Sequence, residues 1–171
     1  MPARRFIKND PEELAAYIKS LASGLVVFDG RSGAGKTPLA TDMAKRLGCK
    51  CADADRCFLD HQRGMFVGAL RVEEMQSSLN ASLAISPLVM FSTVCARQAV
   101  EMAKLSAAAF IWVEHASLVR LDSAEGQFDD YDDDAAPPSI HVVHDEIEAY
   151  ISAYNARRRL DQIVYLNAYD G

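Results

Sequence analysis

The sequence predicts an α/β fold in which helices cover both faces of a five-stranded parallel sheet, giving three layers. Short apolar runs alternate with helical segments along the whole chain. The first apolar run, LVVFD at 25–29, has the composition of a strand buried on both faces, as parallel strands are. The chain has 171 residues, half of them apolar, which is enough for one core and too few for two. Residues 1–171 are therefore expected to form a single domain.

Five apolar runs bounded by turn residues or by helical segments are the predicted strands. The second run is weak in β-branched residues, and the other four are strongly apolar. In chain order they are residues 25–29, 49–54, 86–94, 107–115 and 163–168.

Helical segments separate these strands, and the first has signals at both of its ends. Asp10 is the expected N-cap, Pro11 occupies the first helical position, Glu13 completes a capping box, and Gly24 is the expected stop. An N-terminal helix therefore accounts for most of residues 1–24. The later helices are predicted at 36–48, 69–84, 95–105 and 144–162.

The acidity of the chain is concentrated in one segment. The formal net charge is −6, and residues 122–134 carry seven acids and no base, so removing those seven charges leaves about +1 for the rest. Together with the following AAPPS, this composition predicts an acidic mobile loop at 120–140. The only basic run, 157–159, is expected to be a solvated helix face, so no nucleic-acid partner is expected.

The chain has no apolar run near the roughly 20 residues of a membrane span and no apolar stretch of a secretory signal at its start. A cytoplasmic protein without a membrane partner is therefore expected. Cys49, Cys51, Cys57 and Cys95 include no C-x-x-C pair and are expected to be reduced thiols. Nothing in the sequence specifies an oligomeric state.

The segment GRSGAGKT matches the phosphate-loop pattern G-x-x-x-x-G-K-[ST] and lies between a predicted strand and a predicted helix. Glycines let backbone amides turn inward around phosphate oxygens, and the helix adds its positive end. Lys36 supplies a charge for the outer phosphates, and Thr37 supplies a hydroxyl for magnesium. The predicted nucleotide-binding residues are Gly30, Arg31, Ser32, Gly33, Ala34, Gly35, Lys36 and Thr37.

Pro38 follows the threonine at a position where phosphate loops normally offer another amide. Proline has no N–H, although its fixed φ suits the first turn of a helix. We therefore expect the loop to bind a nucleotide, but less tightly than a phosphate loop that has this amide.

Five segments follow one another along the chain: VVFDGRSGAGKT, ADADRCF, PLVMFSTVCARQAVE, FIWVEH and EIEAYISAYNARRRLDQIVYL. In this order they resemble the successive landmarks of the uridine-kinase-like P-loop kinases, a branch of the P-loop NTPase superfamily. The resemblance implies ATP and Mg²⁺ as cofactors and transfer of a phosphoryl group to a hydroxyl of a small molecule. It also implies an acidic residue at the end of the second strand that acts as base or metal partner. Asp55, with Phe58 behind it, is the nearest match, and Asp53 is the rival. The implied catalytic residues are therefore Asp55, Lys36 and Asp53.

The chain also departs from this family. The third strand usually ends in an acid near magnesium, whereas this one ends in Ser92 and Thr93. Either the metal relies on Thr37 and water, or catalysis is impaired. Glu114 on the next strand is a possible substitute, but a structural role is favoured. The lid that normally carries arginines offers Arg120 and then only the acidic segment.

Several other side chains are weaker candidates. Four of them follow predicted strand ends and are candidates for the acceptor side: Arg56, His61, Arg63 and Arg97. Asn167, after the last strand, is a candidate for the border of an adenine site. Trp112 and Tyr165 are expected in the core.

Three interpretations stay open. The first is a magnesium-dependent ATP phosphotransferase that acts on a nucleoside-like or sugar-like hydroxyl. The second is a nucleotide-binding module of kinase fold with little turnover, and the third is a slow NTPase.

Overall fold

The computed structural model describes residues 5–60, 66–115, 119–120, 127–128 and 141–168. Their central feature is a six-stranded sheet with the order β1-β8-β5-β2-β4-β3, in which every pairing is parallel. The strands are β1 (Arg5–Lys8), β2 (Gly24–Asp29), β3 (Lys50–Asp53), β4 (Leu88–Ser92), β5 (Ala107–His115) and β8 (Gln162–Asn167).

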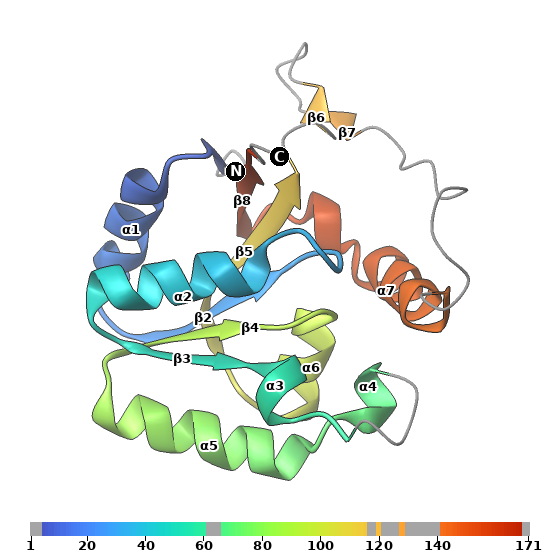
Figure 1. Ribbon diagram of the computed structural model, residues 1–171, viewed down its shortest axis with the longest axis horizontal. Coiled ribbons are helices and arrows are strands. Elements are labelled where there is room, and N and C mark those ends of the chain that lie inside the picture. The colour runs from blue at the N-terminus through green and yellow to red at the C-terminus, as the bar shows by residue number, and fades with distance from the viewer. Residues whose placement is uncertain (1–4, 61–65, 116–118, 121–126, 129–140, 169–171) are drawn as a thin grey trace.

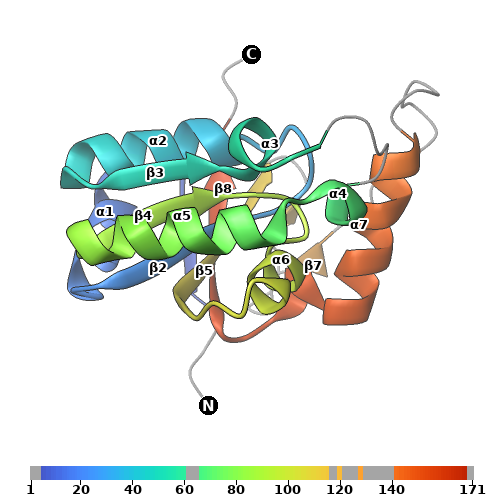
Figure 2. The same ribbon diagram turned by 90° about the horizontal axis from the view of Figure 1, so that it is seen from below.

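Helices cover both faces of this sheet, so the predicted three-layer α/β fold is confirmed (Figure 1 and Figure 2). On one face lie α1 (Pro11–Ser20) and α2 (Lys36–Leu47). The other face carries α3 (Ala54–Cys57), α4 (Phe66–Ala69), α5 (Val72–Ile85), α6 (Ala96–Met102) and α7 (His141–Tyr154), which is followed by the 3₁₀ helix η4 (Ala156–Arg158).

The central strand β2 shows why this arrangement forms. Leu25 and Val27 pack into the core on the α5–α7 face, and Val26 and Phe28 pack into the core on the α1–α2 face. All four side chains are fully buried. An apolar run without polar alternation is stable only between two helical layers, as the sequence predicted.

The predicted number of strands was wrong, because β1 adds a sixth. Residues Arg5–Lys8 pair with β8 at the edge of the sheet, and Ile7 is their only fully buried side chain. A four-residue strand with charged residues at both ends has too little apolar patterning to be recognised from the sequence.

Several helix boundaries also differ from the prediction. The last helix, predicted over 144–162, is observed as α7 followed by the separate 3₁₀ helix η4, and Gln162 already belongs to β8. Asp10 caps α1 as expected, accepting the Glu13 N–H at 2.9 Å. The helix ends at Ser20, however, and Gly24, the expected stop, is the first residue of β2. The predicted helix 69–84 is interrupted between α4 and α5. There the Arg71 N–H donates to the Phe58 carbonyl at 2.8 Å, so this backbone pairs with the preceding loop.

The basic run 157–159 is not a solvated face throughout. The Arg157 side chain is 11% exposed, and its Nε donates to Glu114 at 3.1 Å. Glu114 is buried and also accepts the Trp112 indole N–H at 3.1 Å. A buried carboxylate needs such partners, so Glu114 has the structural role that the sequence favoured.

The predicted loop 120–140 contains some regular structure. The short strands β6 (Val119–Arg120) and β7 (Gln127–Phe128) form an antiparallel pair. The seven acidic residues of the segment lie outside the described residues. In the described part of the chain, none of the helices is long and apolar enough to cross a membrane.

Candidate functional site

The phosphate loop, residues 30–37, begins where β2 ends, near the middle of the sheet. β2 has β4 on one side and β5 on the other, so the order of the strands reverses at this point. Open α/β sheets bind ligands outside the carboxyl ends of their strands at such a switch point. The motif therefore lies where this fold places its ligands.

Two glycines of the loop have a positive φ that other residues rarely adopt, and Gly30 also lies against backbone. Gly30 has φ +143°, and a Cβ there would lie 2.5 Å from the Val113 carbonyl oxygen. Gly35 has φ +89°, and a Cβ there would collide with the Asn167 amide group. Asn167 Nδ2 donates to the Ala34 carbonyl at 3.3 Å, so this residue of β8 holds the second half of the loop.

Lys36 is the first residue of α2, and its side chain is buried. Its ammonium donates to the Arg31 carbonyl at 2.6 Å. Burial lowers the pKa of Lys36, whereas the charges of Asp29, Asp55 and Asp53 act in the opposite direction. Among the described residues that line the pocket, Lys36 is thus the one with a cationic side chain, and the charges of three carboxylates act on it.

Asp53, at the end of β3, is held by four hydrogen bonds. One oxygen accepts the Thr37 hydroxyl and, at 3.0 Å, the Ser92 hydroxyl. The other accepts the amides of Asp55 at 2.9 Å and Arg56 at 3.2 Å, which begin α3. The carboxylate of Asp53 therefore lies beside the end of β4, where Asp53 is the register partner of Ser92.

The oxygens of Asp53 and Thr37 fit magnesium, which prefers hard oxygen donors. Among the described residues, no group of three or more His, Cys, Asp or Glu is placed to hold a metal ion. Magnesium does not require such a cage, because it usually binds through one or two carboxylates, substrate phosphates and water.

These groups meet in a pocket of about 240 Å³. This volume lies below the roughly 300–1,000 Å³ that ligand pockets commonly measure. Asp55 is exposed and faces the pocket from α3. The lining residues are Ser32, Gly33, Gly35, Lys36, Thr37, Pro38, Asp53, Asp55, Ser92, Thr93 and Val94.

Sequence reasoning missed Asp29, which is almost fully buried beneath the loop. One oxygen accepts the Gly30 N–H at 2.8 Å and the Ala96 N–H at 3.4 Å, and the other accepts the Tyr150 hydroxyl at 2.5 Å. Burial raises the pKa of Asp29, and these hydrogen bonds oppose that shift. An acid at the end of an otherwise apolar strand, directly before Gly30, was the available signal.

Other predicted residues lie away from the pocket wall. The Arg31 side chain forms an ion pair with Glu148 of α7. Arg97 pairs with Asp161 at 3.0 Å and lies over the Phe110 ring, and it is not among the described residues that line the pocket. His61 and Arg63 lie outside the described residues. Trp112 and Tyr165 are buried in the core as predicted.

Comparison with solved structures finds two proteins to which this chain is similar. A possible uridine kinase from Bacillus stearothermophilus superposes with a TM-score of 0.61 at 14% identity, covering 90% of this chain and 96% of that chain. A LAO/AO transport system kinase superposes with a TM-score of 0.37 at 19% identity, covering 91% of this chain and 57% of that one. Neither a protein-family model nor a curated protein sequence matches the chain.

The first of these likenesses shows that the chain has the three-layer fold of P-loop kinases, with six strands instead of the predicted five. At 14% identity it shows the fold alone, and the resemblance read from the sequence agrees with it.

Proposed function

We propose that the protein binds ATP with Mg²⁺ and transfers the γ-phosphoryl group to a hydroxyl of a small nucleoside-like or sugar-like molecule. The observation that carries this proposal is the pocket, where the phosphate loop faces two carboxylates in different surroundings. Asp53 is fixed by hydrogen bonds from Thr37 and Ser92, whereas Asp55 is exposed at the pocket. Phosphoryl transfer needs this division, with one group on the metal side and one group for the nucleophile.

Each residue then has one task. The loop amides and Lys36 hold the phosphates, and Thr37 and Asp53 would hold a magnesium ion, which would supply positive charge to neutralise the phosphates. Asp55 accepts the proton of the acceptor hydroxyl. The hydroxyl oxygen forms a bond to the γ-phosphorus while the bond to the β–γ bridging oxygen breaks, and ADP leaves.

Three variants test these roles. Lys36→Ala is expected to abolish MgATP binding in calorimetry. Asp55→Asn is expected to keep binding and to remove ADP release that depends on a nucleoside or sugar. Asp53→Asn is expected to weaken binding of MgATP but not of ATP in EDTA. Asp42→Asn, on the outer side of α2 where Asp42 pairs with Arg46, is the matched control and leaves both properties unchanged. Full turnover in Asp55→Asn would remove Asp55 from its assigned role.

A nucleotide-binding module with little turnover is the second candidate. The pairing of two arginines favours it: Arg31 in the loop pairs with Glu148, and Arg97 in α6 pairs with Asp161. No arginine is among the described residues that line the pocket. MgATP binding without ADP release across a panel of nucleosides and sugars would favour the module, and absence of MgATP binding would refute both candidates.

A further inference from the structure

We propose that α7 belongs to the nucleotide site although none of its described residues lines the pocket. Tyr150 and Glu148 are positioning residues that hold the first half of the phosphate loop. This inference rests on the proposed function, because it concerns how the same loop is kept ready for phosphate.

Tyr150 acts at the start of the loop. Its hydroxyl donates to Asp29 at 2.5 Å and accepts the Arg97 N–H at 3.1 Å. With one carboxylate oxygen fixed in this way, the other is directed to the amides of Gly30 and Ala96. One buried hydroxyl therefore ties the first residue of the loop to the start of α6.

Glu148 acts one residue further along. Its carboxylate accepts hydrogen bonds from both terminal nitrogens of Arg31, one of them at 3.2 Å. The carbonyl of Arg31 is also the acceptor of the Lys36 ammonium, at 2.6 Å. Arg31 is thus held by α7 through its side chain and positions Lys36 through its backbone carbonyl. The ion pair between Arg31 and Glu148 is bidentate, which fixes its geometry.

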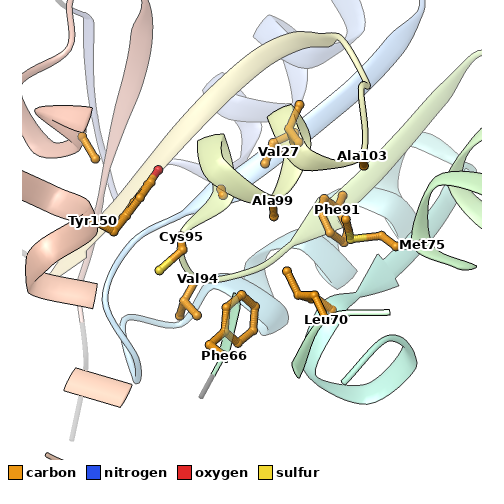
Figure 3. Close-up of a cluster of buried hydrophobic side chains, with 14 of the residues drawn as sticks. Val27, Phe66, Leu70, Met75, Phe91, Val94, Cys95, Ala99, Ala103 and Tyr150 are labelled. Carbon is orange, nitrogen blue, oxygen red and sulfur yellow. The ribbon is translucent and has the colours of Figure 1, made fainter. Parts of the chain in front are cut away.

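Tyr154 offers a matched comparison on the same helix. Its hydroxyl donates to Glu101 at 2.7 Å, and its ring packs 5.1 Å from that of Tyr150. Both tyrosines therefore donate a hydrogen bond to a carboxylate, but only the acceptor of Tyr150, Asp29, is itself hydrogen-bonded to the phosphate loop. Figure 3 shows Tyr150 among the buried apolar side chains of this face, with its hydroxyl directed away from α7.

The experiment measures the affinities of MgATP and of magnesium pyrophosphate by calorimetry, well below the unfolding temperature. Tyr150→Phe is expected to weaken both ligands by the same factor, about threefold to tenfold, because the two share only the phosphates that the loop holds. Tyr154→Phe removes an equivalent hydroxyl and is expected to leave both affinities unchanged. Thermal unfolding of each variant separates loss of stability from loss of affinity.

Glu148→Gln gives a second test, because this half-buried surface position tolerates the change even if Tyr150→Phe does not fold. It is expected to weaken both ligands by a similar factor. Unchanged affinities in Glu148→Gln and in folded Tyr150→Phe would overturn the positioning role while the proposed function stands. A wild-type protein that binds neither ligand would instead refute the proposed function, and the inference with it.

Discussion

Replacing Pro38 with alanine is expected to strengthen nucleotide binding. Gly35 is the N-cap of α2, Pro38 is the third helical residue, and it lines the pocket. The first hydrogen bond of the helix runs from the Leu39 N–H to the Gly35 carbonyl at 3.1 Å. The amides of the helix before Leu39 therefore have no acceptor within the helix, as is typical of helix N-termini that bind anions, and Pro38 is the position among them that has no N–H to offer.

The size of the effect follows from one added hydrogen bond. A bond to a charged group contributes about 1.5–3 kcal/mol, and in a pocket open to solvent the lower figure applies, which is roughly a tenfold gain in affinity. Stability is expected to move in the opposite direction. Losing a proline that already fits the first helical turn lowers stability by about 0.4–1 kcal/mol through the unfolded state.

Calorimetry with MgATP and MgADP measures the gain, and thermal unfolding without ligand measures the loss. Pro87→Ala is the control, because Pro87 precedes β4 at the opposite end of the sheet, where its carbonyl accepts the Gly24 N–H at 2.7 Å. It is expected to change stability without changing affinity. A folded Pro38→Ala variant with equal or weaker nucleotide affinity would show that the missing amide does not limit binding.

Three further predictions concern the body of the protein. Arg157→Leu leaves the carboxylate of Glu114, which is 2% exposed, without the guanidinium that pairs with it. Urea unfolding is expected to show that the variant loses about 3 kcal/mol of stability. Replacement of the exposed Arg158 by leucine is the control and should cost less than about 0.5 kcal/mol; equal losses in the two variants would refute the account. Hydrogen bonding to Arg159, with a further contribution from Arg97, lowers the pKa of Asp161 from its ordinary value of 3.8 to about 2. The ionised carboxylate therefore stabilises the fold at pH values above 3.8, and this contribution is lost as the pH falls toward 2. Asp161→Asn is therefore expected to lower stability at neutral pH by less than about 1 kcal/mol, since the side chain is half exposed, and a deficit that persists near pH 2 would contradict this. Burial raises the pKa of Cys95 to about 12, so a chromogenic thiol reagent should modify exposed Cys51 and Cys57 in the native protein and Cys95 only after unfolding; modification of all four thiols at one rate would refute this.

The parts of the fold that the sequence predicted correctly depend on local signals. The apolar run of β2, the glycine loop and α2, which ends at Leu47 before Gly48, are encoded within one stretch of the chain. β1 escaped prediction because its stability comes from pairing with β8, which lies at the other end of the sequence. The break between α4 and α5 likewise depends on a pairing with the loop at Phe58.

The site was predictable to the same extent. The loop residues follow from the motif, but their supports come from distant elements: Tyr150 and Glu148 from α7, and Asn167 from β8. The hydrogen bond between Tyr150 and Asp29 joins residues that are 121 positions apart, and no periodicity in the sequence records it. The buried charge of Asp29 was visible in the sequence, whereas its partners were not.

The choice between Asp53 and Asp55 shows what the tertiary structure adds. Side chains alternate along a strand, so the register of β3 on β4 decides whether Asp53 faces Thr37. That register places Asp53 beside Ser92, and both hydrogen-bond to Thr37. An acid at position 92 would set two carboxylates side by side and force one of them toward its protonated form. The hydroxyl at the end of β4 and the carboxylate at the end of β3 are therefore two halves of one arrangement, whereas the side chain of Asp55, beyond the strand, is exposed at the pocket.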